Sequence, residues 1–310
     1  MPKKTFYSHG KLLITGEYLV LDGVTALAIP TRKGQYLTVE ENNSNMISWR
    51  SLDAHGNCWF QSNFEINDKE FHPLSENNTQ TSPEVTKTLL KIFSSARALN
   101  SKFLSHQGYT IETRLEFDQQ WGLGSSSTLI NNIAQWAEVN PFTLLEKSFG
   151  GSGYDIACAQ HETPIRYTRN GNTPIINKAL FNPPFKNDIF FIYLNQKQNS
   201  KESIKHYQSL SLKDFDKAEK SINAITEKII VSQELNEFEK LIDSHEQIIS
   251  DIIKTPTVKS RLFEDYTNSI KSLGGWGGDF ILATGTFTDM NYFRNKGYTT
   301  IIPYSEMAFS

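Results

Sequence analysis

The sequence predicts an α+β fold in two domains, on three observations. Alternating and apolar runs typical of strands dominate roughly the first 120 residues. The stretch 201–272 instead carries apolar residues at the spacing of amphipathic helices. Strand patterns return at 280–284 and 298–303, after this helical stretch. The run Phe181-Asn182-Pro183-Pro184 breaks the pattern, so we expect an N-terminal domain over 1–183 and a C-terminal domain over 184–310.

Glycine and proline separate the expected strands of the N-terminal domain. Gly16, Gly23 and Pro30 punctuate the first two apolar runs, and Gly34 introduces the third. Asp and Asn clusters mark turns between the next ones. The strands are expected at 11–15, 25–29, 35–40, 46–50, 58–66 and 109–117.

Two helices are expected among these strands. Ser82-Pro83-Glu84 is typical of a helix start, with a polar cap, a proline at the first helical position and a carboxylate at the positive end. The second helix should begin after Gly124 and end at Asn140-Pro141, because the residue before a proline avoids helical geometry. Beyond residue 183 we expect a buried strand at 188–194, several helices over 201–272 and a short helix at 289–295.

Composition excludes several classes of protein. Lys and Arg total 31 against 34 Asp and Glu, a net charge of -3, so the basic excess of a nucleic-acid-binding protein is missing. Cys58 and Cys158 are too few for a disulfide framework, which favours a reducing compartment, the cytoplasm. Polar residues interrupt every apolar stretch, and we therefore expect neither a membrane span nor a membrane partner.

The segment WGLGSSST, residues 121–128, is the strongest local signal. Two glycines and three serines lead from a strand into a helix, where exposed backbone N–H groups suit phosphate oxygens. An ordinary Gly-Ser loop with a serine cap is an equally good interpretation of this segment alone. The segment is neither GxxxxGK[ST] nor GxGxxG, so the nucleotide folds with those signatures lose support.

Three further segments carry residues suited to chemistry. In GGSGYDIACA (150–159), Asp155 could orient a substrate hydroxyl, although spacing alone favours a helix cap. In KSLGGWGGDF (271–280), the glycines indicate either a tight structural turn or a close ligand. Near the N-terminus, Lys11 could supply a point charge to a phosphoryl group and Glu17 could orient a cation, though such residues are most often on the surface.

Taken together, these segments resemble the GHMP kinases, the superfamily of galactokinase, homoserine kinase, mevalonate kinase and phosphomevalonate kinase. The resemblance rests on three motifs in the expected order: GKLLITGEYLVLDG, GLGSSST and KSLGGWGGDFIL. Within the superfamily the chain looks most like phosphomevalonate kinase. That family has Asp-Ile-Ala near its active site, as in GYDIA at 153–157, and a glycine motif ending in Gly-Gly-Asp, as at 277–279.

The resemblance implies a role for each matching residue. Lys11 and Asp155 become catalytic, with Asp155 facing the acceptor hydroxyl. Magnesium would bind Ser126, with Glu146 as a further candidate ligand. The ATP phosphate loop would consist of Gly122, Leu123, Gly124, Ser125, Ser126 and Ser127. Substrate-binding candidates are Glu17, Lys197, Ser200, Lys201, Gly275, Trp276 and Gly277, and the whole segment 274–279 would line the site. For Lys197, Ser200 and Lys201, a solvated loop that caps a helix is the stronger interpretation.

The resemblance also implies the fold and the activity. We expect a GHMP kinase fold, with an N-terminal mixed sheet covered by helices and a helix-rich, ferredoxin-like C-terminal domain. The expected activity is transfer of the ATP γ-phosphoryl group, with Mg²⁺, to a small molecule. The expected acceptor is 5-phosphomevalonate. The alternatives are mevalonate, another sugar or amino alcohol, and a non-catalytic ligand-binding regulator, and the expected assembly is a monomer or a homodimer.

Overall fold

The computed structural model describes residues 3–67, 71–74, 82–105, 107–210 and 215–309, apart from the side chain of Ser200. These residues divide into two compact units, each built from separate stretches of the chain. Unit 1 comprises Met1–Gly10, Lys33–Gln119 and Gly124–Gln160, and unit 2 comprises Lys11–Arg32, Gln120–Leu123 and His161–Ser310. Strands β1 (Lys4–Leu13) and β2 (Ala26–Asn42) contribute residues to both units. A domain boundary near residue 183 stays a prediction.

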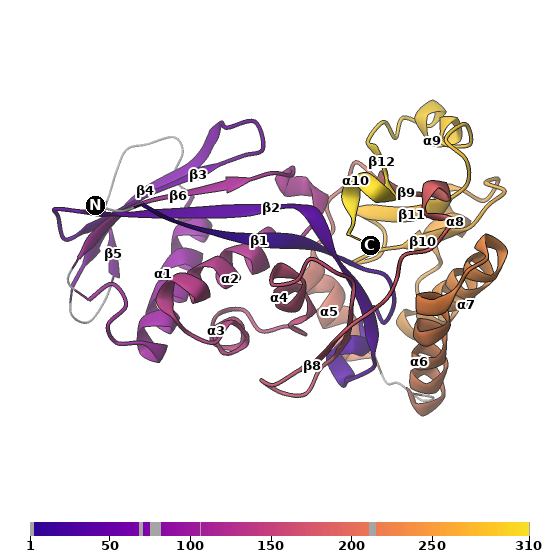
Figure 1. The fold of residues 1–310 in the computed structure, drawn as a ribbon, viewed down its shortest axis with the longest axis horizontal. Helices are drawn as coiled ribbons and strands as arrows, with labels where there is room; N and C mark the ends of the chain where they lie inside the picture. The colour runs from indigo at the N-terminus through magenta and orange to yellow at the C-terminus, as the bar shows by residue number, and fades with distance from the viewer. Residues whose placement is uncertain (1–2, 68–70, 75–81, 106, 211–214, 310) are drawn as a thin grey trace. The chain divides into compact units, whose positions relative to one another are not determined.

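Unit 1 is a mixed sheet with helices on one face (Figure 1). Its strand order is β5-β4-β3-β6-β2, in which β3 and β6 run parallel and the other neighbours are antiparallel. The strands expected at 46–50, 58–66 and 109–117 are confirmed as β3, β4 and β6. The elements are β3 (Met46–Leu52), β4 (Cys58–Ile66), β5 (Phe71–Pro73), α1 (Pro83–Leu99), β6 (Gly108–Leu115), α2 (Ser125–Ala137), α3 (Pro141–Ser148) and α4 (Tyr154–Ala159).

Phe93 on α1 centres the core of unit 1. Its ring lies 5.6 Å from Trp49 on β3, 5.7 Å from Phe64 on β4 and 5.6 Å from Phe71 on β5, measured between ring centroids. The helix begins as expected, since the Ser82 side chain accepts a hydrogen bond from the Val85 amide. The apolar face of α1 is thereby fixed against three strands of the sheet.

One correction concerns β2, which we expected as two strands interrupted at Pro30 and Gly34. The structure has a single strand through both residues. Pro30 lies between the ladder to β7, which ends at Ala28, and the ladder to β6, which begins at Gln35, so neither of these two ladders uses its missing N–H. Gly34 is required by close approach, because a Cβ there would lie 2.2 Å from the Ser8 carbonyl oxygen.

A second correction concerns Asn140-Pro141. The helix α2 ends earlier, at Ala137, and Asn140 opens a further helix, α3, that the sequence analysis did not include. The Asn140 side chain accepts hydrogen bonds from the amides of Phe142 and Thr143, at 2.9 and 3.0 Å. Proline at the first helical position needs no such acceptor, so this pair is a helix start.

Unit 2 contains a four-stranded antiparallel sheet in the order β10-β11-β9-β12. Strands β7 and β8 form a hairpin that pairs with the Ala26–Ala28 part of β2. The strands expected at 188–194, 280–284 and 298–303 are β9, β11 and β12. The elements are η1 (Leu19–Asp22), β7 (Ile165–Thr168), β8 (Ile175–Lys178), η3 (Lys186–Asp188), β9 (Ile189–Tyr193), α5 (Ser200–Ser209), α6 (Phe215–Val231), α7 (Leu235–Ile253), α8 (Val258–Leu262), β10 (Ile270–Ser272), β11 (Phe280–Thr284), α9 (Asn291–Asn295), β12 (Ile301–Pro303) and α10 (Tyr304–Met307). The short helix η2 (Gln119–Trp121) includes residues of both units.

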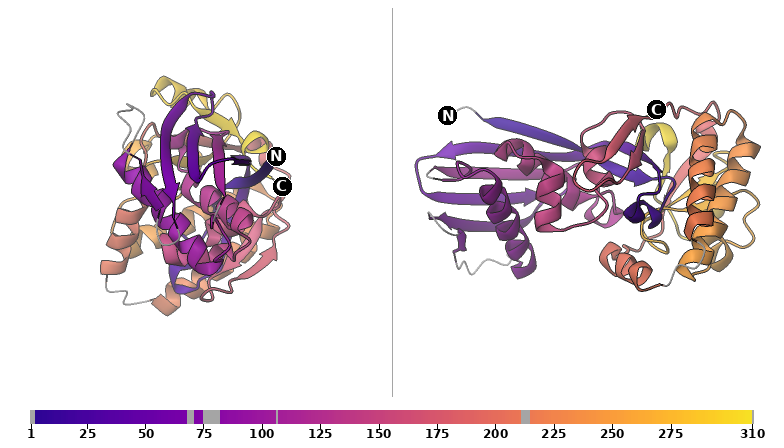
Figure 2. Two further views of the ribbon diagram at one scale, coloured as in Figure 1. Left: turned by 90° about the vertical axis from the view of Figure 1, so that its left-hand side faces the viewer. Right: turned by 90° about the horizontal axis from the view of Figure 1, so that it is seen from below.

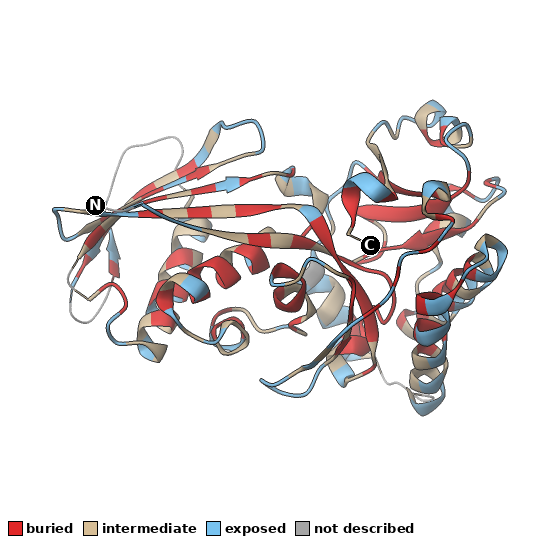
Figure 3. Cartoon of the chain, in the orientation of Figure 1, coloured by how far each residue is buried: buried red, intermediate tan, exposed pale blue. Residues whose placement is uncertain are grey.

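Helices α6 and α7 lie side by side in unit 2 (Figures 1 and 2). The buried face of α7 includes Phe238, Ile242 and Ile249 at helical spacing, and burial follows one side of the helix in Figure 3. His245 and Glu246 also lie on this buried face. Two polar residues inside an apolar stripe need partners. The Gly16 amide provides one for His245, and the Ser272 hydroxyl provides one for Glu246. No helix within the described ranges is long and apolar enough to cross a bilayer.

Candidate active site

The first element of the candidate site is the turn that leads into α2. Gly122 and Gly124 both have positive φ, of 65° and 91°, and the first helical hydrogen bond runs from the Thr128 amide to the Gly124 carbonyl at 3.0 Å. Among the described residues no side chain caps this end of α2. The amides of Ser125, Ser126 and Ser127 are therefore directed out of the helix, where they suit an anion.

The second element is Asp155, in the first turn of α4. The Ser127 hydroxyl donates a hydrogen bond to Asp155 Oδ2, and the Ile156 amide contacts Oδ1 at 3.1 Å. Gln160 at the end of α4 donates to Asn131 on α2 at 2.8 Å, so the two helices are joined at both ends of α4. The structure thus brings together two predicted site residues that are 28 positions apart in the sequence.

A buried polar network holds α2 against the sheet of unit 1. Thr128 donates to the Gln35 side chain at 2.7 Å, and the Asn132 amide group donates to the Gln35 carbonyl at 2.9 Å. Ser8 on β1 donates to Asn132 at 2.7 Å and accepts from Asn131 at 2.9 Å. These bonds are local in space but distant in sequence, and the sequence analysis did not include them. They fix the position of the serine-rich helix start.

Lys11 lies against the same turn in unit 2. Its backbone amide donates to the Leu123 carbonyl at 3.0 Å, and its ammonium group donates to the Gly122 carbonyl at 2.8 Å. The predicted catalytic lysine and the start of the predicted phosphate loop are therefore in direct contact. A cation held here offers its charge beside the turn.

The glycine motif before β11 packs against the segment 196–198. A Cβ at Gly275 would lie 2.6 Å from Gln198 Cγ, and one at Gly278 would lie 2.9 Å from the Gln196 carbonyl oxygen. The Asp279 amide donates to the same Gln196 carbonyl at 2.6 Å. The motif therefore makes a close backbone contact beside Lys197, one of the predicted substrate ligands.

Trp276 is buried rather than open to solvent. Its side chain packs in a cluster with Tyr18 and Tyr207, whose rings stack at 5.5 Å. Within the described part of the chain its indole Nε1 has no hydrogen-bond partner. Burial and a positive φ of 50° give the Gly274–Gly278 turn a fixed shape.

Asp279 ends the 274–279 segment that the resemblance expects to line the site, and no individual role was predicted for it. It is only 6% exposed, and the Gln198 amide donates to its Oδ1 at 3.1 Å. Burial raises the pKa of its carboxyl group, while the Gln198 hydrogen bond and the charges of Lys11 and Lys197 lower it in part. The signal that could have revealed it is the Gly-Gly-Asp sequence directly before a buried strand.

Glu17 lies in a buried charged cluster with Lys271 on β10 and with His245 and Glu246 on α7. The Lys271 ammonium group donates to Glu17 Oε1 and lies 3.4 Å from Glu246 Oε1. Ser272 donates to Glu246 at 2.8 Å. The predicted substrate role of Glu17 stays a prediction, and the structure shows its carboxylate bound to Lys271 at 1% residue exposure.

The charge of this cluster depends on pH. Burial lowers the pKa of His245 well below its usual value, and its Nε2 accepts the Gly16 amide at 3.0 Å, so the imidazole is neutral. Two carboxylates then face one lysine. Burial raises the pKa of Glu17 to about 7 despite the Lys271 charge, and it also raises the pKa of Glu246.

The remaining predicted residues are on the surface. Ser126 and Glu146, the predicted magnesium ligands, are exposed on α2 and α3. Lys197 and Lys201 are exposed before and in the first turn of α5, and the side chain of Ser200 lies outside the described residues. Across the ranges that the structure describes, no three His, Cys, Asp or Glu side chains gather into a metal site.

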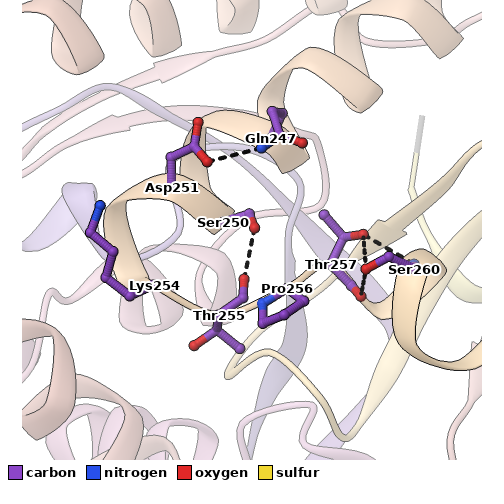
Figure 4. Close-up of a pocket in the computed structure, with 8 residues that line it drawn as sticks. All are labelled: Gln247, Ser250, Asp251, Lys254, Thr255, Pro256, Thr257 and Ser260. Carbon is purple, nitrogen blue, oxygen red and sulfur yellow. Dashed lines mark hydrogen bonds between the residues drawn. The ribbon is translucent and has the colours of Figure 1, made fainter.

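A cavity of about 490 Å³ lies elsewhere in unit 2, at the end of α7 (Figure 4). Several of the side chains that line it bond to one another or to nearby backbone, as Gln247 does to Asp251 and Ser250 to the Thr255 carbonyl. None of the predicted site residues lines this cavity. We therefore do not assign it to the candidate active site.

Comparison with known proteins identifies the fold. No protein-family model matches the chain, and no curated protein sequence matches it. Solved structures do match. Mevalonate kinase from Methanococcus jannaschii has a TM-score of 0.70 at 12% identity, over 97% of this chain and 97% of that one. Galactokinase from Lactococcus lactis, complexed with galactose, has a TM-score of 0.67 at 12% identity, over 94% and 88%.

A third match is phosphomevalonate kinase from Streptococcus pneumoniae, in complex with phosphomevalonate and AMPPNP. Its TM-score is 0.65 at 15% identity, over 94% of this chain and 95% of that one. These proteins share the GHMP kinase fold, and the fold expected from the three sequence motifs is confirmed. The matches include several GHMP kinases with different substrates, so they do not single out phosphomevalonate kinase.

Replacing Glu17 should change how stability depends on pH. The pKa of Glu17 in the folded protein, about 7, lies above the ordinary 4.5, so the folded state keeps a proton that the unfolded chain releases between these values. The contribution of the Glu17 proton to the free energy of unfolding is complete below the ordinary pKa. It is lost as pH rises towards the pKa of the folded protein, at roughly 1 kcal/mol per pH unit. Chemical denaturation should show that the free energy of unfolding falls less between about pH 5 and about pH 8 for Glu17→Gln than for wild type. The exposed Glu65→Gln should follow wild type, and equal losses in all three proteins would contradict the assignment.

Gly122→Ala should destabilise the protein more than the matched change Gly171→Ala. Both glycines have positive φ, of 65° and 52°, so both variants carry the same backbone strain of about 1–2 kcal/mol. Only at Gly122 would the new Cβ lie 2.3 Å from the Asp279 carboxyl carbon, whereas nothing lies within 4 Å at Gly171. Denaturant titration should therefore give a lower free energy of unfolding for Gly122→Ala. Equal losses in the two variants would show that the turn has room at Gly122.

Proposed function

We propose that the chain is an ATP-dependent kinase, which transfers the γ-phosphoryl group of ATP to a small-molecule acceptor. The observation that carries the proposal is the hydrogen bond between Ser127 and Asp155. It places a carboxylate able to orient a hydroxyl group beside a helix start able to bind phosphate. The GHMP kinase fold and the contact of Lys11 with the same turn support this reading.

The residues of the turn fit ATP and magnesium. The amides of Ser125–Ser127 provide donors for phosphate oxygens without a competing cap in the described residues. Mg²⁺ usually takes few protein ligands and keeps substrate phosphates and waters as its other ligands. The exposed Ser126 hydroxyl would therefore be enough to hold the ion beside ATP, with Glu146 as a further candidate ligand. When bound, the ion would neutralise charge on the ATP phosphates.

The chain's own residues then have separate tasks. Asp155 orients the acceptor hydroxyl group and accepts its proton. Lys11 stabilises negative charge that develops on the transferred group and on the attacking oxygen. Phosphoryl transfer requires alignment and charge stabilisation more than covalent help, and therefore no enzyme-bound intermediate is needed.

The proposed acceptor is 5-phosphomevalonate, with mevalonate second and other sugars or amino alcohols third. Lys197 and Lys201 support an acceptor that already carries a phosphate, because both are exposed cations beside the segment that contacts the glycine motif. The phosphomevalonate kinase with this fold was crystallised with phosphomevalonate. We also keep the cytoplasm as the proposed compartment and a monomer or homodimer as the proposed assembly.

Asp155→Asn should lower kcat by about 10²–10⁴-fold while nucleotide binding stays near wild type. Asparagine keeps a hydrogen-bond acceptor for Ser127 but cannot take a proton at the required place. Asp216→Asn, an exposed acid in the first turn of α6, is the matched control and should keep full activity. Coupled measurement of ADP release, with calorimetry of ADP binding, tests both expectations. A nearly wild-type kcat would remove Asp155 from its role.

Lys201→Ala should distinguish the two proposed isoprenoid acceptors, 5-phosphomevalonate and mevalonate, by its effect on KM. Loss of one charge-assisted hydrogen bond to an acceptor phosphate should raise KM for 5-phosphomevalonate by about 10-fold and leave KM for mevalonate unchanged. Lys205→Ala, an exposed lysine on the same helix, serves as the control.

If only galactose or homoserine is phosphorylated by the wild type, the isoprenoid assignment is wrong. ATP binding without turnover on any acceptor would favour a ligand-binding regulator.

A further inference from the structure

Asp279 combines three features that stability alone does not explain. It has a positive φ of 54°, its carboxylate is buried, and that carboxylate faces the Gly122 turn. A buried carboxylate loses hydration that a single amide hydrogen bond replaces only in part. A non-glycine residue with positive φ adds backbone strain. Both effects lower the stability of the fold, and such costs concentrate at functional sites.

The surroundings of Asp279 belong to the residues already predicted for phosphate and substrate binding. Its Oδ1 accepts the Gln198 amide at 3.1 Å, next to Lys197. Both carboxylate oxygens approach Gly122 so closely that a Cβ there would lie 2.4 and 2.6 Å from them. Lys11, whose ammonium group donates to the Gly122 carbonyl, acts on the carboxylate electrostatically, as does Lys197.

We propose that Asp279 is a positioning residue, which holds Lys11, the Gly122 turn and the 196–198 segment in the arrangement that the reaction needs. This inference rests on the proposed kinase function and extends it by giving Asp279 an individual role, beyond lining the site with the rest of the 274–279 segment. Asp279 does not act on substrate itself. Its charge attracts two lysines, and its volume fits against the one residue of the turn that has no side chain. Position 279 requires a negative charge and a positive φ. Aspartate meets both requirements, since Asp and Asn tolerate this backbone conformation better than other non-glycine residues.

The test is Asp279→Asn, which keeps the shape, the backbone preference and an acceptor for Gln198 but removes the charge. We expect kcat to fall at least about 10-fold, because Lys11 is no longer held by an opposite charge and small misplacements are costly. We expect the melting temperature at about pH 8 to stay equal or rise, because a buried charge is lost. Binding of metal-free ADP, measured by calorimetry in EDTA, should be at least as tight as in wild type, since a negative charge beside the turn is removed.

A purely structural role predicts a different pattern. In that case Asp279→Asn would melt earlier, would bind ADP more weakly and would lose activity in proportion. Either that pattern or an unchanged kcat would overturn the inference. Glu138→Gln is the matched control, because Glu138 is also an acid with positive φ, of 54°, but is exposed at the end of α2. It should change none of the three measurements. If Asp279→Asn does not fold, Asp279→Gly removes the carboxylate while allowing the same backbone, and it should show the same loss of kcat.

Failure of the proposed function is distinguishable from failure of this inference. A wild type that binds ADP but phosphorylates none of the tested acceptors would overturn the proposed kinase function. Comparison of ADP binding and melting temperature between wild type and Asp279→Asn would still decide the role of Asp279. A wild type that binds no ADP would overturn both. An active wild type with an equally active Asp279→Asn would overturn the inference alone.

Discussion

The buried ammonium group of Lys271 is the constraint on which the arrangement of unit 2 depends. An ammonium group removed from water needs opposite charge close by, and losing its partner would cost about 3–5 kcal/mol. Glu17 and Glu246 supply that charge. Glu17 follows the strand that carries Lys11, and Lys271 lies on β10, directly before the glycine motif. One interaction therefore fixes the ends of two segments that contribute to the candidate site.

The two units position their predicted site residues by different means. In unit 1, neutral groups do so, since Ser8, Gln35, Thr128 and two asparagines form a hydrogen-bonded network under α2. Such a network orients a helix without placing a charged side chain under its start. In unit 2, charge and close backbone contact are used together, at Lys11, Asp279 and the glycine motif. Both means favour rigid placement, which the proposed phosphoryl transfer would require more than reactive side chains.

The sequence predicted well what local pattern determines. The glycine-serine turn before α2, the cap at Ser82 and the strands β4 and β11 are each encoded within a few residues. Features set by distant partners were not predictable. The environment of Glu17 depends on Lys271, 254 positions away, and that of Asp279 depends on Gly122 and Gln198. Pro30 was misleading for the same reason, because proline interrupts a ladder only where a neighbouring strand needs its N–H, and the ladders of β2 to β6 and β7 both leave position 30 unpaired. Asn140-Pro141 shows a different limit, since one dipeptide can end a helix or begin one.

The contact between Gly122 and the Asp279 side chain also constrains how this sequence can diverge. The two positions share one small volume, so a side chain gained at 122 is tolerable only if the side chain at 279 is lost in the same lineage. Position 279 itself can exchange among Asp, Asn and Gly at little backbone cost, whereas β-branched residues are excluded by its φ. Among related chains, a side chain at position 122 should therefore occur only together with glycine at position 279, so the pair of residues at these positions marks proteins that share this form of the turn.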